Sequence, residues 1–515
     1  MLIGYVSNER YLALDGVSVE IEGEGDSVGT VSRASGAIHA DVLPGRYRIT
    51  LNKPGFGAKH VDLTLPTSEP HQFRLLSDDL IGYMWPKWVK YGDRAEFRIH
   101  SPEPYKVGLW RYGFQKEFIK NWGWYDDHGP RATIQLTPDG DYTQTGIQWN
   151  TVGYGLGWHK QFVTAPERGG LYYIHAETAS GKFFSFPWLV SPPEPEAEIC
   201  VLMSTITWNA YNNYGGRSNY INQDRLPPKP IVHARQDCLR YTNPDTWPYQ
   251  VTAAPLSFDR PALGHFVPKD AQVTDQLEGR IAPCYAPGEW RLLGWLDRER
   301  FPYDIYPDVD FHFDRIPLDR YKVIILNTHP EYWSPEMYFR MKEWVFEKGG
   351  RLMNISGCGL LAEVEFVDDT TMLCRREEIW ELRKEPPATL MGVEYTHSGF
   401  NSGAPFRVVN ADHWAYEGTG LKTGDIFGVR NQIERCSGGA SSLELDKITE
   451  NSPANIEHLA RGTNNGDQGA DAAMFTTPGG GMVFSSGSLG WPLSLLVDQS
   501  CSQITRNVLE RFLNT

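Results

Sequence analysis

The chain lacks the features of several large classes of protein. Lys and Arg number 49 against 64 Asp and Glu, a formal net charge of −15. No basic stripe is present that could neutralise phosphates, so nucleic acid is not an expected partner. No apolar run approaches the roughly 18 to 20 residues that a membrane helix requires. The N-terminal run MLIGYVSNERYLALDG has neither the basic start nor the long apolar stretch of a signal peptide. We therefore expect a cytoplasmic protein without a membrane partner.

Cysteine is scarce and is not spaced in pairs. The seven cysteines are scattered along the chain without a CxxC pair, which argues against a disulfide framework and a thiolate zinc site. A hydrophobic fraction of 41% is typical of a globular protein, and 515 residues suffice for two to four domains. The 17 Trp and 25 Tyr favour large sandwich cores, with aromatic pockets or subunit interfaces as the alternative.

Two all-β modules are predicted before residue 195. Over residues 1–78, runs such as VSVEIEG and GRYRITLNK are divided by Gly, Pro and Asp turns, as in short strands. The stretch VLPGRYRITLNKPGFGAK resembles the carboxypeptidase-regulatory or transthyretin-like β-sandwich. Over residues 79–195, AEFRIHS, KVGLWRYG and GLYYIHAETASG alternate, which predicts an immunoglobulin-like sandwich. The Pro- and Glu-rich segment 191–198 marks the domain boundary.

Residues 196–515 have the pattern of an α/β domain with a mostly parallel sheet. ICVLMS, YKVIILN and RLMNIS are continuous apolar runs, as expected of strands buried on both faces. Between the last two runs, a helix is predicted from the N-cap Ser334 to the stop at Gly349 and Gly350. Strand, helix and strand in so few residues predict a right-handed βαβ unit.

Three stretches that could carry chemistry follow predicted strands. The first comes after ICVLMS, where Tyr211, Tyr214 and Tyr220 lie within ten residues of one another around the turn Gly215-Gly216. Each phenol, if buried, needs a partner for its oxygen. Aromatic surface or interface packing is the alternative for these tyrosines.

The second stretch is THPEYW, directly behind the apolar run VIIL. In open α/β sheets this carboxyl edge is where ligands gather. Residues i and i+2 of an extended segment point the same way, so His329 and Glu331 could face one pocket. Buried, they need a metal, a substrate or each other. A histidine satisfied within the core is the commoner outcome for such a pair.

The third stretch, GGASSLELDKIT, alternates acidic residues with leucines. Glu444 and Asp446 fall on one face of this predicted half-buried strand, and solvent alone could explain that face. Asp471, just before the predicted strand AAMFTT, is a weaker candidate of the same type.

Two further features have simpler explanations. Cys358 follows a predicted parallel strand in the run ISGCG, where α/β enzymes often mount a nucleophile, but free cysteines usually fill cores. Asp308, Asp310, His312 and Asp314 alternate in PDVDFHFD and could suggest a metal. A strand edge with one wetted face explains them more simply.

Taken together, residues 199–515 resemble the large (beta) subunit of N,N-dimethylformamidase and its relatives. The matching runs, in order, are AYNN at Tyr211, SNY ending at Tyr220, SFDRP, THPEYWS, GGRLM, IWELR, LELDK and GGGMVFSSGSLGW. HPEYW and the GGRLM that follows one helix later are the most specific of these.

The resemblance implies a core related to the glutamine-amidotransferase layout and a mononuclear ferric centre held by two tyrosinates and one glutamate. The ligands would be Glu331, Tyr211 and Tyr220, with Tyr214 and Tyr249 as alternatives to Tyr220. Anionic oxygen ligands suit hard ferric iron. A metal with open positions polarises an amide carbonyl and lowers the pKa of a bound water.

Further roles follow from the same resemblance. His329 and Glu444 would move protons, because an amide nitrogen leaves poorly unless protonated. Cys358, Asn212 and Trp333 would contact the substrate. The run NISGCG departs from the family, since Cys358 stands where an asparagine is expected, and a thiol cannot donate and accept as an amide does.

We therefore expect a metal-dependent hydrolase that cleaves the carbon–nitrogen bond of a small non-peptide amide, a formamide or an N-alkyl amide. A homo-oligomer is expected, with or without a small accessory subunit. One alternative is a cysteine-dependent amidase that uses Cys358 and His329. The other is a non-catalytic protein that binds a ligand without a metal.

Overall fold

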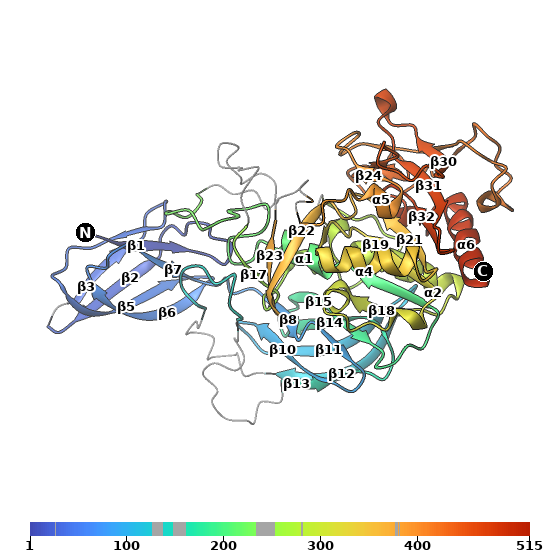
Figure 1. Cartoon of the computed structure of the whole chain (residues 1–515). Helices are drawn as coiled ribbons and strands as arrows, with labels where there is room; N and C mark the ends of the chain where they lie inside the picture. Colours follow the sequence, from blue (N-terminus) through green and yellow to red (C-terminus); the bar gives the residue numbers. More distant parts are fainter. Residues whose placement is uncertain are drawn as a thin grey trace.

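The computed structural model describes residues 1–25, 27–125, 137–147, 161–232, 253–279, 282–375, 380 and 382–515. Its larger sheets follow one another along the chain, from blue to red in Figure 1. No sheet of this described part mixes strands from before and after residue 78, or from before and after residue 195. The predicted domains 1–78, 79–195 and 196–515 agree with these breaks, and as independent domains they stay a prediction.

The N-terminal module consists of two sheets packed face to face around a core of its own. Alternating apolar residues in β2 (Ser18–Gly23) and β5 (Gly45–Lys53) face that core, as the period of two requires. One sheet has the order β4 (Ala37–His39), β1 (Leu2–Ser7) and β7 (His71–Arg74). The other has the order β3 (Ser27–Val31), β2 (Ser18–Gly23), β5 (Gly45–Lys53) and β6 (Gly57–Leu65).

The second module also consists of two sheets, and a separate aromatic-rich core lies within it. The smaller sheet has the order β13 (Phe162–Thr164), β10 (Arg94–His100) and β8 (Ile81–Trp85). The larger sheet has the order β12 (Lys116–Tyr125), β11 (Tyr105–Tyr112), β14 (Gly170–Thr178), β15 (Phe183–Ser191) and β9 (Trp88–Lys90). The transthyretin-like and immunoglobulin-like assignments of the two modules stay predictions.

The third part is built on a nine-stranded mixed sheet. Its order is β18 (Asp304–Pro307), β16 (Ile199–Met203), β19 (Val323–Thr328), β21 (Arg351–Ser356), β32 (Met482–Ser485), β31 (Asp471–Thr476), β30 (Glu457–Gly462), β26 (Phe406–Val408) and β27 (Ile426–Phe427). The pairings from β18 to β32 are parallel, and those from β32 to β27 are antiparallel. The sheet is therefore parallel only in its first half, and the glutamine-amidotransferase-like layout stays a prediction.

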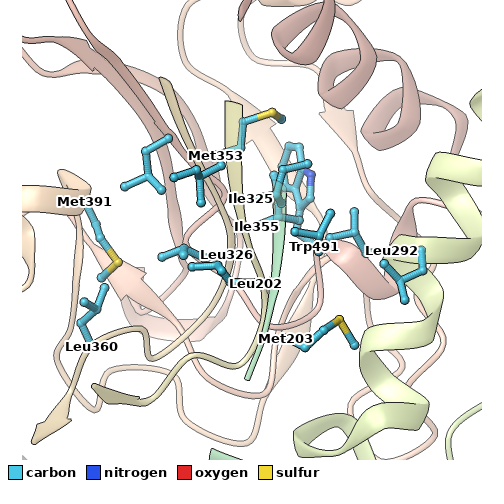
Figure 2. Close-up of a cluster of buried hydrophobic side chains, with 14 of the residues drawn as sticks. Leu202, Met203, Leu292, Ile325, Leu326, Met353, Ile355, Leu360, Met391 and Trp491 are labelled. Carbon is cyan, nitrogen blue, oxygen red and sulfur yellow. The ribbon is translucent and has the colours of Figure 1, made fainter. Parts of the chain in front are cut away.

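Helices cover the parallel half of this sheet. The longer ones are α2 (Ala286–Glu299), α4 (Pro335–Phe346) and α6 (Gln499–Asn514). The predicted helix after Ser334 is confirmed, because Ser334 caps α4 by accepting from the N–H of Met337. Figure 2 shows both sides of this sheet: Ile325 and Met353 from neighbouring strands lie beside Trp491, whereas Leu202 lies with Leu326 on the side of Leu360 and Met391.

Shorter elements surround the end of the sheet where the parallel strands finish. The short helices are α1 (Thr205–Tyr211), α3 (Asp308–His312) and α5 (Ala388–Met391). A four-stranded sheet has the order β17 (Leu256–Ser257), β23 (Thr371–Cys374), β22 (Ala362–Asp368) and β20 (Tyr332–Trp333). Two small pairs are β24 (Glu394–Tyr395) with β29 (Asp446–Lys447) and β25 (Gly403–Ala404) with β28 (Ser441–Ser442).

The structure corrects the interpretation of residues 308–314 as a strand edge. Asp308 begins helix α3, with Asp308 and Asp310 in its first turn, where carboxylates favour the positive end of a helix. Alternation of acidic residues is therefore not a strand signal here.

Within the described part of the chain, no helix is long and apolar enough to span a bilayer.

Candidate active site

Side chains from three separate stretches meet where the parallel strands end. Tyr211 is the last residue of α1, the helix that follows β16. His329 and Glu331 occupy the short link between β19 and β20. Glu444 lies between β28 and β29. The carboxyl edge of the parallel strands thus gathers the residues that the sequence analysis placed there.

His329 is at the centre of this group. Its Nε2 lies 2.9 Å from Oε2 of Glu331, 3.4 Å from Oε2 of Glu444 and 3.3 Å from the hydroxyl of Tyr211. Burial lowers the pKa of His329, but Cys284, Glu444 and Glu331 around it raise that pKa well above its usual value. Two carboxylates therefore share one imidazole in a place that water does not reach.

The hydrogen bonds of His329 call for a positive charge beside Glu331. Nδ1 lies 3.1 Å from the carbonyl oxygen of Gly357, and because a carbonyl only accepts, Nδ1 carries a proton. A neutral ring would then turn the lone pair of Nε2 toward the carboxylate. Oε2 of Glu331 accepts no aligned hydrogen bond from any described residue. A proton or another cation must lie in this space.

The other oxygen of Glu331 is held by tyrosine. Tyr220 donates from its hydroxyl to Oε1 of Glu331 at 2.7 Å, and accepts from the hydroxyl of Tyr332 at 2.8 Å. Asn219 in turn donates to the hydroxyl of Tyr332 at 2.6 Å. The rings of Tyr211 and Tyr220 lie 4.4 Å apart between their centroids. Both phenol oxygens thus lie in the group formed by Glu331 and His329.

Glu444 and Asp446 are buried rather than solvated. The expected strand is interrupted at Leu443, whose φ of 71° turns the chain so that Glu444 approaches His329. Oδ1 of Asp446 accepts from the N–H of Cys358 at 2.8 Å, and its side chain is fully buried. Burial raises the pKa of Asp446 to about 8. The acidic face of this segment therefore points into the protein.

Cys284 is a member of the group that the sequence analysis did not single out. It ends a short 3-10 helix (Ala282–Cys284) directly before α2, and its thiol hydrogen-bonds His329. Burial raises the pKa of this thiol, while His329 lowers it. Among the described residues no strand ends directly before Cys284, and no motif of the sequence analysis contains it, so only the fold reveals its position.

The three predicted substrate-binding residues are all buried. The N–H of Cys358, whose φ is 55°, is bound by Asp446. Asn212 donates to the carbonyl of Pro261 at 3.0 Å, and its side-chain oxygen accepts from an N–H at 3.1 Å. Trp333 packs against Phe311 with ring centroids 5.6 Å apart. Their roles toward a substrate stay predictions.

Other candidates lie elsewhere. Tyr214 belongs to the core of the second module and packs against Tyr142. Asp471 forms an ion pair with Arg461 at 2.9 Å and lies 2.9 Å from His458. Tyr249 lies outside the described residues, as does part of the run IWELR.

The chemistry of the group fits a hard metal ion such as ferric iron. Tyr211, Tyr220 and Glu331 offer oxygen donors, and Oε2 of Glu331 is a buried acceptor without an aligned donor among the described residues. In that part of the chain, no three His, Cys, Asp or Glu side chains are arranged to hold a metal. A metal ion in this place would therefore need the tyrosine oxygens.

Comparison with known families gives a match over most of the chain. The family described as N,N-dimethylformamidase beta subunit-like, C-terminal, matches residues 117–503. The chain belongs to this family. The match begins in β12, inside the second module, and therefore before the start of the resemblance over residues 199–515. It leaves the N-terminal module outside.

Two curated relatives bear the same name. The N,N-dimethylformamidase beta subunit of Paracoccus aminophilus is 24% identical over 434 residues, which cover 69% of this chain and 54% of that protein. The N,N-dimethylformamidase beta subunit of an Alcaligenes species is 24% identical over 438 residues, with the same shares. The chain thus spans about half the length of the curated relatives it matches.

Solved structures add nothing to this comparison. A DUF3823 family protein from Bacteroides ovatus aligns with 36% of this chain and 96% of its own, at 10% identity and a TM-score of 0.14. Such a score carries no argument about fold or function.

Proposed function

We propose that this protein is a metal-dependent hydrolase that cleaves the carbon–nitrogen bond of a small linear amide, a formamide or an N-alkyl amide. Membership of the dimethylformamidase family supports the reaction class. The observation that carries the proposal is the group around Glu331, in which Tyr211, Tyr220 and His329 surround one buried carboxylate. Such a group is costly to bury unless it binds something.

In the proposal, Tyr211, Tyr220 and Glu331 hold a mononuclear ferric ion. The ion would supply Lewis-acid activation of the amide carbonyl and of water. Burial and the nearby Glu331 raise the pKa of the Tyr211 phenol well above its usual value. Without a cation, that phenol keeps its proton. The Tyr211 phenol therefore becomes a suitable anionic ligand only when positive charge lies beside it.

His329 and Glu444 would handle the protons of the reaction. The carbonyl of Gly357 holds Nδ1 of His329, which leaves Nε2 as the nitrogen that faces the group. Glu444 lies within 3.4 Å of that nitrogen and belongs to a different loop. One of the two can accept the proton of the attacking water, and the other can donate to the departing amine.

The environment of the group suits this chemistry. The side chains of His329 and Glu331 are 1% and 3% exposed. Electrostatic interactions are stronger in such a dry place than in water, and they need little reorganisation during the reaction. Because these side chains are almost completely buried, we expect a small amide rather than a peptide as the substrate.

Assembly and location belong to the same proposal. The two relatives are named as beta subunits. We propose that this chain also assembles, as a homo-oligomer or with a small accessory subunit, and that it acts in the cytoplasm.

A second candidate function is favoured by the contact between Cys284 and His329. A thiol that hydrogen-bonds a histidine is the pair that a cysteine-dependent amidase requires. In that mechanism Cys284, rather than Cys358, would attack the carbonyl, and His329 would take its proton.

The decisive experiment measures metal and colour in purified protein. Tyrosinate bound to ferric iron absorbs visible light, so the wild type should be coloured and contain about one iron per chain. Glu331→Ala should lose the band, and its iron content should fall by roughly tenfold or more, since it removes a ligand. Glu343→Ala is the matched control, because Glu343 is an exposed carboxylate paired with Lys348. The assignment would be wrong if Glu331→Ala kept full iron and full turnover.

The same preparations separate the alternatives. If the protein is colourless and free of metal, yet hydrolyses formamides until a thiol reagent is added, the cysteine mechanism holds, and Cys284→Ala should be inactive. A colourless protein that binds amides without hydrolysing them would be a non-catalytic binder.

A further inference from the structure

The segment between Tyr211 and Tyr220 is held by the N-terminal module. That module, in blue in Figure 1, lies beside the green segment that follows α1. At the middle of the segment, Gly215 donates its N–H to the carbonyl of Glu9 at 2.7 Å. Its own carbonyl accepts from Nη2 of Arg74 at 2.8 Å. Both backbone polar groups of Gly215 are therefore bound by residues of one other module.

The Arg74 side chain connects three parts of the chain by hydrogen bonds. Its side chain is completely buried. Besides Gly215, its guanidinium donates to the carbonyl of Asn8 at 2.8 Å and to that of Gly140 at 3.1 Å. The group lies 4.5 Å from the ring centre of Tyr11 and 5.1 Å from that of Tyr142. A planar guanidinium with directed donors suits this use, whereas a lysine ammonium does not.

The segment approaches its neighbours so closely that only glycine fits. Gly215 and Gly216 have φ values of 95° and 94°, which side chains rarely adopt. A Cβ on Gly216 would lie 2.6 Å from Cβ of Tyr11. A Cβ on Gly215 would lie 2.6 Å from Cγ2 of Thr143. The contact between module and segment is therefore tight and specific.

The segment passes this constraint on to Tyr220. Three residues separate Gly216 from Tyr220. The hydroxyl of Ser218 accepts from the N–H of Tyr220 at 3.0 Å. Asn219 donates its N–H to Ala210 at 2.8 Å, next to Tyr211, and its side chain reaches Tyr332. A shift of the Gly215-Gly216 turn would thus move the tyrosine that holds Glu331.

We propose that the N-terminal module, residues 1–78, is a positioning element of the active site, and that Arg74 is the residue through which this module holds the segment 212–220 in place. The module lies outside the family match. Its role as support for metal ligands rests on the proposed function. Its role in holding the segment 212–220 in place does not depend on that function.

Hydrogen exchange on the intact chain, prepared without metal, tests directly whether the N-terminal module holds the segment 212–220 in place. Arg74→Met should speed amide exchange in peptides covering residues 212–221 by roughly tenfold or more, because a buried hydrogen bond from a charged donor is lost. Arg48→Met is the matched control. Arg48 is an exposed arginine of the same module, paired with Asp62, and exchange in this segment should not change. Arg74→Lys serves as a second variant in case Arg74→Met does not fold. It keeps the charge but not the planar set of donors, and amide exchange in this segment should be intermediate between those of the wild type and Arg74→Met.

Measurements of iron binding then test whether the contact between the module and the segment 212–220 affects the active site. If the wild type binds iron, Arg74→Lys should weaken iron affinity and shift the visible band, while Arg48→Met should do neither. If the wild type binds no iron, the proposed function fails, and faster exchange in the segment still supports the role of the module in holding it in place. Unchanged exchange at residues 212–221 in both folded Arg74 variants would overturn the inference, whatever the metal content.

Discussion

At the scale of single residues, three residues beside the active site have a left-handed backbone conformation. Thr328, Cys358 and Leu443 have φ values of 54°, 55° and 71°, a conformation that costs about 1–3 kcal/mol for such side chains. They adjoin His329, Gly357 and Glu444, respectively. Each strained residue turns the chain so that its neighbour reaches the group around Glu331. Residue type at these positions carries no sign of this, so the sequence could not predict it.

Asp308 offers a test of buried charge outside the active site. Its carboxylate is buried and accepts from Thr205 and from the N–H of Ile206 at 3.0 Å. Burial raises its pKa from 3.8 to about 7. Between roughly pH 4 and pH 7 the folded state therefore holds a proton that the unfolded state has lost, and this carboxyl lowers stability as the pH rises.

Asp308→Asn should remove this dependence, since the amide oxygen can still accept both hydrogen bonds. The loss of unfolding free energy from pH 4.5 to pH 7.5 should shrink by at most about 4 kcal/mol. Urea unfolding at both pH values measures the difference. Identical pH slopes for the variant and the wild type would contradict the prediction.

At the scale of elements, local signals decided what could be predicted. The helix at residues 335–346 was predictable because Ser334, Pro335 and the following glycines are local cap and stop signals. The short helix at residues 308–312 was misread, since alternating acids suggested a strand. Glu444 was singled out because acidic residues alternate with leucines around it, and the resemblance gave it a role, whereas its burial depends on the turn at Leu443. The antiparallel half of the sheet follows from long-range pairing that no local run contains.

The turn at Gly215-Gly216 allows a matched test of close packing. Gly216→Ala places a methyl group at a φ of 94° and 2.6 Å from Tyr11. Gly55→Ala introduces the same methyl group at a φ of 82° with open space around it. Both should lose about 1–2 kcal/mol to the backbone conformation. Gly216→Ala should lose about 1–3 kcal/mol more from the clash. Chemical denaturation compares them, and equal losses would show that the turn is not tightly packed.

At the scale of the whole molecule, the three parts are joined in different ways. The N-terminal module encloses an apolar cluster of its own, whereas the cluster of the α/β part also contains Tyr112, Leu171, Tyr173 and Leu189 of the second module. Tyr214 belongs to the cluster of the second module although it lies between Tyr211 and Tyr220. The sequence resembled the right family, and its division into three domains stays a prediction. It could not show that the segment around Tyr214 is shared by all three.

Calorimetry of the whole chain tests this coupling. In the wild type, contacts of Arg74 with Gly215 and Gly140 should make the N-terminal module unfold together with the rest. In Arg74→Met, a separate transition for the small module should appear several degrees lower. Arg48→Met should keep the wild-type profile. A single, undivided transition in Arg74→Met would show that other contacts suffice.

The order of the chain gives the contact between Arg74 and Gly215 a consequence for biosynthesis. Arg74 precedes its partner by 141 residues, and its module has a core of its own. Domains generally fold as units while the chain is still being made. The N-terminal module can therefore be complete before Tyr211 and Tyr220 leave the ribosome. The last residues to join the group, Glu444 among them, would then meet tyrosines already held in position by a module that is made before them.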